Sequence, residues 1–351
     1  MIAHINFQKV DRSNMLQLLT GFPQQFKKAR QIGETFNLNI KQDDVRNIVF
    51  AGMGGSAIGG DLIISCLNHE LRIPAIVNRN YFLPKFVNQS SLVFVSSFSG
   101  STEESLSCYA DAKTKKAKIV CITSGGKLAQ QAKEDGTPLI RIPGGMQPRA
   151  ALGYLAIPLL VLLSRSGFAK LTSEDFDETE MLLEQKEKIY SPAEPTNDAL
   201  NLANQLKNKI PILYSSADLL SVVPVRWKGQ FSENAKVLAF SNVFPELNHN
   251  EIVGWERLPD ILTNFQIIYF HDRDDYTRNQ KRMVITQKIL EKVTSPIIEL
   301  YSEGKSRLAR LISLIYLGDW VSFYLAAING IDPTPVEKIQ ILKNMLSSEN
   351  D

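Results

Sequence analysis

Glycine and serine residues near the start of the chain form a loop that could bind an anion. The apolar run 47–51 leads into Gly52, Gly54, Gly55 and Ser56, and a helix is expected to follow. Glycines allow backbone N–H groups to approach a ligand, and the amino end of a helix favours negative charge. A tight turn whose glycines serve packing alone would give the same pattern.

Two nucleotide-binding patterns fit this loop poorly. Gly52, Gly54 and Ala57 meet only the looser form of the dinucleotide fingerprint, G-x-G-x-x-A. No clear acidic residue closes a second strand about 20 residues later, where a ribose would need it. The nucleoside triphosphatase motif fails as well, because the sequence lacks a G-K-[ST] here. The loop therefore favours an anion site over a nucleotide site.

A second loop has the composition expected for binding a phosphate. The run 92–96 leads into Ser97, Ser99 and Thr102, and Glu103 begins an expected helix. Hydroxyls together with amides at the start of a helix suit a phosphate monoester. Thr102 could instead serve only as a helix cap. Because both loops follow strands of one parallel sheet, they should open at its carboxyl edge, where doubly wound folds bind ligands.

The elements that must position these loops follow from the apolar pattern. Short β-branched runs alternate with amphipathic stretches, which is typical of parallel βαβ units in an α/β fold. We expect strands at 47–51, 92–96, 118–123, 139–142, 211–215, 237–240, 266–270 and 296–301. We expect helices at 153–166, 175–190, 275–293 and 305–328, and a last one from 335 onward. The Pro-rich, polar stretch 191–198 indicates a domain boundary.

Length, charge and composition exclude several classes of protein. The 351 residues are enough for two ordinary domains. A net charge of +2 provides no global field for nucleic acid or a membrane surface, so an anionic ligand must be held locally. The longest apolar run, 155–163, is too short to span a membrane and predicts a buried helix. Three cysteines without metal-like spacing and an amino terminus without a signal-peptide pattern predict a cytoplasmic protein.

The two loops resemble those of a known family. GMGGSAIGGD followed by SSFSGSTEE resembles the sugar isomerase (SIS) domain, in which a Ser-x-Ser-x-x-Thr loop holds the sugar phosphate. With PGGMQPRAALGY, FSENAK, FPELNHNEIVGWE and DPTPVEKIQILK, the sequence resembles the bifunctional phosphoglucose/phosphomannose isomerases over residues 48–346. The resemblance implies two SIS-type doubly wound parallel-sheet subdomains, which are flavodoxin-like. We expect an N-terminal helical segment at 1–40, a first SIS domain at 41–167, a helical linker at 168–195, and a second SIS domain with a C-terminal helix at 196–351.

The resemblance implies isomerisation of hexose 6-phosphates between aldose and ketose through an enediol, and it assigns roles to three residues. Glu233 corresponds to the family's carboxylate base, and Arg149 to the arginine that stabilises the enediolate. His249 corresponds to a histidine that assists ring opening in the neighbouring subunit's site, which implies a homodimer. Without the resemblance, these residues would pass for a solvated helix glutamate, a surface ion-pair member and a loop histidine.

The resemblance also assigns substrate contacts. Sugar phosphate binding falls to Gly54, Gly55, Ser56, Ser97, Ser99 and Thr102, and Thr334 would help admit the mannose epimer. The last helix supplies a lysine for the ring and hydroxyl groups, and both Lys338 and Lys343 qualify. With Thr334 as helix cap and Pro335 as first helical residue, Lys343 lies near the apolar face and Lys338 points away. We therefore assign Lys343.

Metal and cofactor chemistry is not expected. The four histidines are scattered singly, which does not suit a zinc site, and enediol isomerisation is redox-neutral. Two alternatives stay open: a non-catalytic sugar-phosphate-binding SIS regulator and an aminosugar-phosphate isomerase. A regulator would be expected to carry a helix-turn-helix region and a basic face, which the sequence does not suggest. The preference between glucose and mannose 6-phosphate depends on how one hydroxyl epimer fits, and stays undecided.

Overall fold

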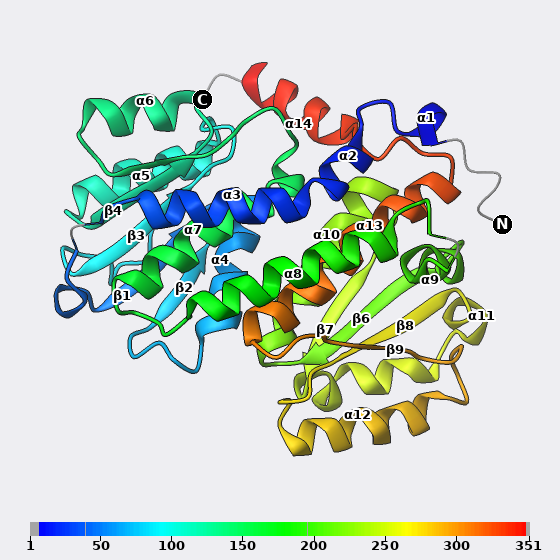
Figure 1. Ribbon diagram of the computed structural model, residues 1–351. Coiled ribbons are helices and arrows are strands. Elements are labelled where there is room, and N and C mark those ends of the chain that lie inside the picture. Colours follow the sequence, from blue (N-terminus) through cyan, green and yellow to red (C-terminus); the bar gives the residue numbers. More distant parts are fainter. Residues whose placement is uncertain (1–6, 39, 195, 349–351) are drawn as a thin grey trace.

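Two parallel β-sheets form the framework of the computed structural model, which describes residues 7–38, 40–194 and 196–348 (Figure 1). Within these residues the first sheet has the strand order β2-β1-β3-β4-β5 and the second has β7-β6-β8-β9. The strands are β1 Asn47–Ala51, β2 Ala75–Asn78, β3 Ser91–Ser96, β4 Lys118–Thr123, β5 Leu139–Arg141, β6 Ile210–Ser216, β7 Phe240–Phe244, β8 Phe265–His271 and β9 Ile298–Tyr301. The order of the first sheet is that of flavodoxin-like folds, so the expected fold class is confirmed.

Helices and short turns connect the strands. The α-helices are α1 Phe7–Val10, α2 Met15–Thr20, α3 Phe22–Thr35, α4 Gly54–Leu67, α5 Glu103–Thr114, α6 Gly126–Glu134, α7 Leu152–Arg165, α8 Ser173–Tyr190, α9 Asp198–Gln205, α10 Val222–Gln230, α11 Pro259–Leu262, α12 Thr277–Leu290, α13 Arg307–Ile328 and α14 Glu337–Ser348. The 3₁₀ turns are η2 Gln42–Asp44, η3 Pro148–Ala150, η4 Leu219–Ser221, η6 Glu246–His249 and η7 Glu251–Glu256, and η5 Phe231–Ala235 is a π-helical turn.

Most of the expected strands are confirmed, and two errors have physical causes. The strands at 47–51 and 118–123 are confirmed residue for residue. The sequence reasoning missed β2, an edge strand of four residues whose side chains are mostly half-buried, so its apolar pattern is weak. The expected strand 237–240 is wrong, because β7 starts at Phe240. Val237 N–H instead bonds the Phe231 carbonyl and completes the turn after η5.

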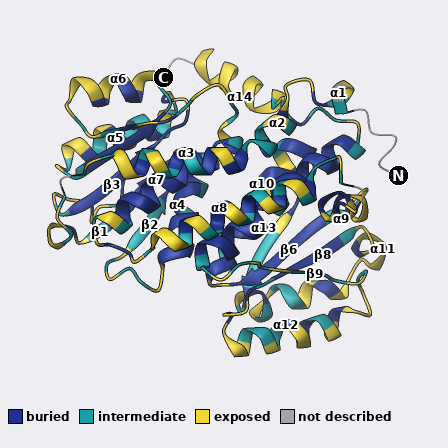
Figure 2. Ribbon diagram, viewed as in Figure 1, coloured by how far each residue is buried: buried dark blue, intermediate teal, exposed yellow. Residues whose placement is uncertain are grey.

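The main core lies between the two sheets. Figure 1 shows α3, α4, α7, α8, α10 and α13 between them. Figure 2 shows α7 and α13 largely buried, whereas α3 and α8 each keep an exposed face. Helices α5 and α6 pack on the outer face of the first sheet, and α11 and α12 on that of the second. The two domains therefore share one hydrophobic core, and the first sheet's carboxyl edge is held in a fixed position relative to α10.

Two apolar helices belong to this core. The predicted buried helix around 155–163 is confirmed as α7, whose residues from Leu152 to Leu163 are all buried. Helix α13 is long and apolar enough to cross a membrane by length and composition alone. However, 89% of its most apolar stretch is buried inside the fold. Burial on all sides explains why its sequence is apolar all round rather than amphipathic.

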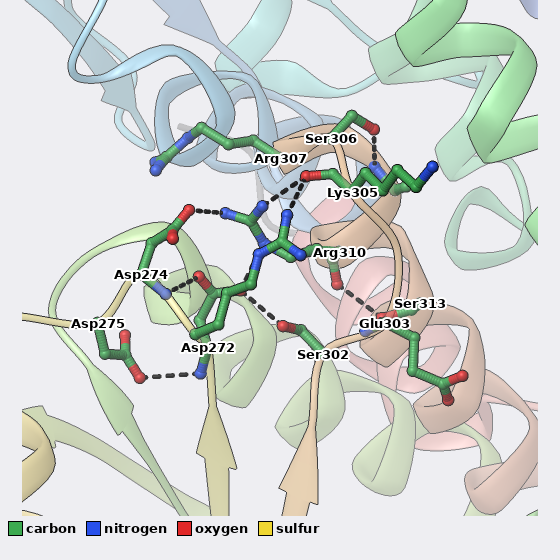
Figure 3. Close-up of polar contacts among 12 residues, drawn as sticks. Asp272, Asp274, Asp275, Ser302, Glu303, Lys305, Ser306, Arg307, Arg310 and Ser313 are labelled. Atoms are coloured by element: carbon green, nitrogen blue, oxygen red, sulfur yellow. Dashed lines mark hydrogen bonds and ion pairs between the residues drawn. The ribbon is translucent and has the colours of Figure 1, made fainter.

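The carboxyl edge of the second sheet is filled by protein side chains (Figure 3). Arg310 of α13 is buried there, and its Nε donates to Asp272 Oδ2 at 2.9 Å. Its Nη1 donates to the Lys305 carbonyl at 2.7 Å, and its Nη2 pairs with Asp274. Ser302 Oγ also donates to Asp272, at 2.6 Å. This edge, where a doubly wound sheet would otherwise bind a ligand, is occupied by an internal ion-pair network.

Candidate active site

The glycine loop ends where α4 begins, at the switch point between β1 and β3 of the first sheet. A Cβ on Gly55 would lie 2.7 Å from the Pro148 carbonyl oxygen, so only glycine lets α4 pack this closely on η3. Gly54 has φ +50, in the left-handed region that glycine adopts without strain. The amino end of α4 is thereby brought against the turn that carries Arg149, next in sequence to Pro148.

The serine loop is organised by its own hydroxyls. Ser97 is 1% exposed, and its Oγ donates to Thr102 Oγ1 at 2.9 Å. The same oxygen accepts from the Gly100 N–H at 3.0 Å. Thr102 directly precedes α5, but its side chain forms no capping hydrogen bond with the helix. The capping alternative for this side chain is therefore wrong, because its hydroxyl is turned back toward Ser97.

Neighbouring loops hold the serine loop in place. Gly100 has φ +70, and a Cβ there would lie 1.7 Å from the Gly125 carbonyl oxygen. Ser56 Oγ, from the glycine loop, accepts from the Phe98 N–H at 3.3 Å and so joins the two loops. Ser99 is exposed, and its Oγ accepts only from the Ser101 N–H, at 3.3 Å, within the described residues. A rigid loop with an exposed hydroxyl at its tip is suited to contact a phosphate.

Arg149 lies at the meeting point of the two domains. It is 3% exposed, and its Nη1 lies 3.2 Å from Glu233 Oε2. Its Nε donates to Asn234 Oδ1 at 2.6 Å, and its Nη2 donates to the carbonyls of Pro333 and Thr334 at 2.8 Å each. Burial lowers the pKa of Arg149, and the charge of Glu233 opposes this shift. These four bonds with described residues leave one of the five guanidinium N–H groups, on Nη1, free for a ligand.

Glu233 is carried by the π-helical turn η5, which continues α10. Such turns are rare and often occur at functional sites, because the extra residue re-aims the side chains beyond it. The Glu233 side chain is 33% exposed, so it is held by Arg149 yet open to a ligand. Lys236 ends the turn, and its Nζ donates to the Glu233 carbonyl at 2.5 Å. Burial and the charge of Arg149 lower the pKa of Lys236.

A cavity of about 540 Å³ brings several of the predicted residues together. Gly54, Gly55, Arg149 and Glu233 all line it, together with further residues of α4 and α10. The serine loop does not line this cavity. The hydrogen bond from the Phe98 N–H to Ser56 Oγ connects the serine loop to the glycine loop. Arg149 and the glycine loop from the first domain and Glu233 from the second therefore face a common space.

The prediction that Thr334 caps the last helix and that Pro335 is its first residue is wrong. Helix α14 begins at Glu337, because the preceding backbone is engaged elsewhere. Arg149 binds the Thr334 carbonyl, and the Thr334 N–H bonds Asp332 Oδ1 at 2.9 Å. Thr334 Oγ1 is buried without a partner among the described residues.

The two candidate lysines lie in different surroundings. Glu233 lines a second hollow, of about 710 Å³, together with Lys236 and Lys338. Lys343 does not line it, and every described residue of α14 is exposed, including the apolar Leu342 (Figure 2). The argument that chose Lys343 assumed a buried apolar face, which a single chain does not provide.

His249 is not brought to the Arg149–Glu233 pair within one chain. It lies exposed on η6, which follows β7. Its side chain forms no hydrogen bond or ion pair with another described residue. An exposed imidazole is available to a second molecule, as the resemblance requires.

Sequence reasoning missed the residues that surround Arg149 on its buried side. They are Arg226, Gln230, Asn234, Asp319 and Ser322, all buried. One signal was present, because Asp319 is the only charged residue between 311 and 328, and a carboxylate in an apolar helix needs a buried partner. Asn234 follows Glu233 in FSENAK, but nothing in its local sequence singles it out.

Comparison with known proteins finds relatives that cover most of the chain. Residues 195–346 match the family described as the bacterial phospho-glucose isomerase C-terminal SIS domain. The bifunctional phosphoglucose/phosphomannose isomerase of Caldicellulosiruptor bescii is 48% identical over 339 residues, which cover 96% of this chain and 100% of that protein. The protein of the same name from Aquifex aeolicus is 40% identical over 302 residues, or 86% of this chain and 90% of that one.

A solved structure shows the same fold at low identity. A hypothetical protein of Thermus thermophilus superposes with a TM-score of 0.71 at 15% identity, covering 96% of this chain and 91% of that one. Such an identity supports the fold alone, whereas the two sequence relatives establish the family. The chain therefore belongs to the family of bifunctional phosphoglucose/phosphomannose isomerases.

Proposed function

We propose that the protein is an isomerase that interconverts glucose 6-phosphate and mannose 6-phosphate with fructose 6-phosphate through a cis-enediol. Membership of the family supports the substrate class. The observation that carries the mechanism is the Arg149–Glu233 pair at the cavity between the domains. A carboxylate beside a buried guanidinium supplies a base and an electrophile within reach of the same carbon atoms.

The proton transfer follows from this pair. Glu233 takes the C2 proton of the open-chain aldose, the C–H electron pair forms the C1–C2 double bond, and the C1 carbonyl oxygen becomes the enediolate oxygen. The free Nη1 N–H of Arg149 would hydrogen-bond this oxygen. Glu233 then returns the proton to C1 while the O2 hydroxyl proton moves to O1, which gives the ketose. No external oxidant or reductant is needed.

One intermediate accounts for two aldose substrates. Glucose and mannose 6-phosphates differ only in configuration at C2, and C2 becomes planar in the enediol. A single base that reaches C2 of either epimer would therefore feed the same intermediate. We assign the fit of the second epimer to the neighbourhood of Thr334, whose buried hydroxyl lacks a described partner.

The phosphate is assigned to the two loops. Gly54, Gly55 and Ser56 offer the amino end of α4, and Ser97, Ser99 and Thr102 offer hydroxyls at the amino end of α5. A phosphate bound here would hold the sugar at the carboxyl edge of the first sheet. The position of this edge relative to Glu233 is fixed by the packing of Gly55 on Pro148.

The remaining assignments concern the second subunit and the lysine. We propose a homodimer in which His249 of one subunit assists ring opening in the other, in line with its exposure. We keep Lys343 as the assigned lysine and Lys338, which shares a hollow with Glu233, as its competitor. A cytoplasmic location is proposed as well, and the three cysteines, Cys66, Cys108 and Cys121, are free thiols, which suits a reducing compartment.

An assay of both products tests this function. Purified protein is incubated with fructose 6-phosphate in excess EDTA, and glucose 6-phosphate and mannose 6-phosphate are both measured, beside a Glu233→Gln variant. The wild type should form both, and the variant should lose about 10²–10⁴-fold in rate. Turnover of an aminosugar phosphate alone would favour the aminosugar alternative. Binding without turnover of any sugar phosphate would favour a sensor.

A further inference from the structure

A buried polar network surrounds Arg149, and two of its members, Arg226 and Gln230, also line the cavity. It begins at Asp319 of α13, whose carboxylate accepts from Arg226 Nε at 3.1 Å and Nη2 at 3.0 Å. Gln230 Nε2 donates to the same carboxylate at 2.8 Å. Arg226 Nη2 also donates to the Arg149 backbone carbonyl at 2.6 Å. Asp319 therefore anchors the Arg149 main chain through one intermediate residue.

A second path reaches the Arg149 side chain. Arg149 Nε donates to Asn234 Oδ1 at 2.6 Å, and Asn234 Nδ2 donates to Ser322 Oγ at 2.9 Å. Ser322 Oγ in turn donates to the Asp319 backbone carbonyl at 2.8 Å. The two paths close a circuit that begins and ends at Asp319, and both Asn234 and Ser322 are almost completely buried.

The direction of these bonds is determined by one hydroxyl proton. Ser322 has a single O–H, which is used on the Asp319 carbonyl, so toward Asn234 it can only accept. The Asn234 amide must then present its NH₂ to Ser322 and its oxygen to Arg149. Without the hydroxyl the amide loses one of the two contacts that hold this orientation, and only the bond from Arg149 Nε still favours it. Its flipped form would place an N–H donor against a guanidinium that has no acceptor.

We infer that Ser322, Asn234 and Asp319 are positioning residues that orient the guanidinium of Arg149 toward Glu233 and the cavity. This inference rests on the proposed isomerisation for its kinetic consequence, but its structural content does not depend on it. Removing a correctly placed donor from a developing oxyanion typically costs a factor of about 10²–10³ in kcat, and misplacing it costs part of that factor. The phosphate loops are untouched, so KM should change little.

Helix α13 offers a closely matched control pair of serines. Ser322 and Ser313 are both buried, and each donates its hydroxyl to the carbonyl three residues earlier, Asp319 and Arg310 respectively. Each also accepts one hydrogen bond, Ser322 from Asn234 and Ser313 from the backbone N–H of Glu303. Ser322→Ala and Ser313→Ala therefore each remove one donated and one accepted hydrogen bond from the same helix, but only Ser322 belongs to the circuit around Arg149.

The kinetic test compares these two variants with the wild type on fructose 6-phosphate. Ser322→Ala should lower kcat by about tenfold or more with KM within about threefold, while Ser313→Ala stays within about twofold for both. Thermal unfolding of both variants checks that the fold is kept. Equal kcat values for the two variants would overturn the inference, because a purely structural role predicts equal effects.

A measurement without turnover separates this inference from the proposed function. In protein labelled with ¹⁵N at arginine Nε, the Arg149 signal is assigned by its loss in Arg149→Lys, and its exchange with solvent is measured. Exchange should accelerate by about tenfold or more in Ser322→Ala and in Asn234→Ala, but not in Ser313→Ala. Unchanged exchange in Ser322→Ala would overturn the positioning role even if no sugar phosphate is isomerised.

Discussion

Ser97 is the residue whose hydroxyl most directly shapes the serine loop. It donates to Thr102 and accepts from Gly100, so Ser97→Ala should remove the described partner of the Thr102 hydroxyl and leave the Gly100 N–H with the Ser97 carbonyl alone. Loss of a hydrogen bond that organises a charged ligand's site costs roughly 1.5–3 kcal/mol, so KM for fructose 6-phosphate should rise about 10–100-fold with kcat nearly unchanged. Steady-state kinetics measures this.

The neighbouring Ser105 provides the control for this substitution. Its hydroxyl is also buried, but it bonds the Ser96 carbonyl inside the fold rather than the serine loop. Ser105→Ala should cost stability and leave KM within about twofold. An equal rise of KM in both variants would show that general loosening, and not the loop, is responsible.

Asp275 gives a pH-dependent stability prediction. It is 4% exposed, its Oδ2 accepts from the Asp272 N–H, and its Oδ1 is buried without a described partner. Burial raises the pKa of Asp275 to about 6, above its unfolded value near 3.9. Between about pH 4 and 6 the folded chain therefore binds more protons at this site than the unfolded chain does. The free energy of unfolding falls as the pH rises through this range, and the stability that protonated Asp275 contributes is lost above about pH 6.

Replacing Asp275 with asparagine removes this charge. Asp275→Asn should raise the free energy of unfolding by about 1–3 kcal/mol at pH 8 and by much less near pH 4.5. Urea unfolding of both proteins at the two pH values measures the difference. A variant that is no more stable than the wild type at pH 8 would contradict the assigned pKa.

The chemistry of single residues could be predicted only in part. Residue type and motif singled out Arg149 and Glu233, and the structure pairs them at 3.2 Å. Ser322 could not be found, because its partner Asn234 is 88 positions away and neither residue is unusual in its local sequence. The choice of Lys343 over Lys338 gained no support, because it assumed that one face of α14 is buried and the described residues of α14 are all exposed. Which face of a helix is buried depends on tertiary contacts that the local sequence does not give.

At the scale of elements, strand positions followed from short apolar runs, while their ends depended on pairing. Phe240 pairs with Ile212 of β6, so β7 begins at Phe240 and not at Val237, where the expected strand began. The π-helical turn η5 had no sequence pattern of its own, since FSENA would also suit an ordinary helix. The division at 41, 168 and 196 into helical segment, domains and linker stays a prediction.

The contact between α4 and η3 makes a testable prediction about elements. Gly55→Ala would place a Cβ 2.7 Å from the Pro148 carbonyl oxygen, so α4 and the turn carrying Arg149 must separate. We expect kcat/KM to fall about tenfold or more, because small displacements of catalytic groups are costly. Kinetics on fructose 6-phosphate measures the loss.

Gly144 serves as the control, because it lies between β5 and η3, in the connection that also contains Pro148. A Cβ there would lie 3.5 Å from the Ser124 side chain, an ordinary contact. Gly144→Ala should keep kcat/KM within about twofold. If Gly55→Ala were as active as Gly144→Ala, the close packing of α4 on η3 would not matter for the site.

At the scale of the whole molecule, the two sheets share a strand order but differ at their carboxyl edges. In the first sheet this edge carries the glycine and serine loops, and in the second it is closed by the Arg310 network (Figure 3). The alternation of strands and helices predicted two such sheets. It could not predict which edge would stay open, since that depends on an arginine contributed by a distant helix.

The proposed homodimer can be tested by mixing two inactive variants. If His249 acts in the partner's site, a heterodimer of Glu233→Gln and His249→Ala chains contains one intact site and one doubly altered site. Random exchange of subunits should then restore about a quarter of wild-type activity. Mixtures that remain as inactive as the separate variants, after exchange is verified by native mass spectrometry, would contradict a shared site.

Proton transfer by Glu233 is the central claim, and exchange with solvent tests it most directly. The wild type and Glu233→Gln are incubated with fructose 6-phosphate in deuterium oxide, and deuterium at C2 of both aldose products and at C1 of the remaining ketose is measured by NMR. We predict deuterium at these carbons with the wild type, because the proton held by the partly exposed Glu233 can exchange with solvent before it is returned. In Glu233→Gln, the rates of exchange and of product formation should both fall by about 10²–10⁴-fold. Wild-type rates of exchange and product formation in Glu233→Gln would contradict the account.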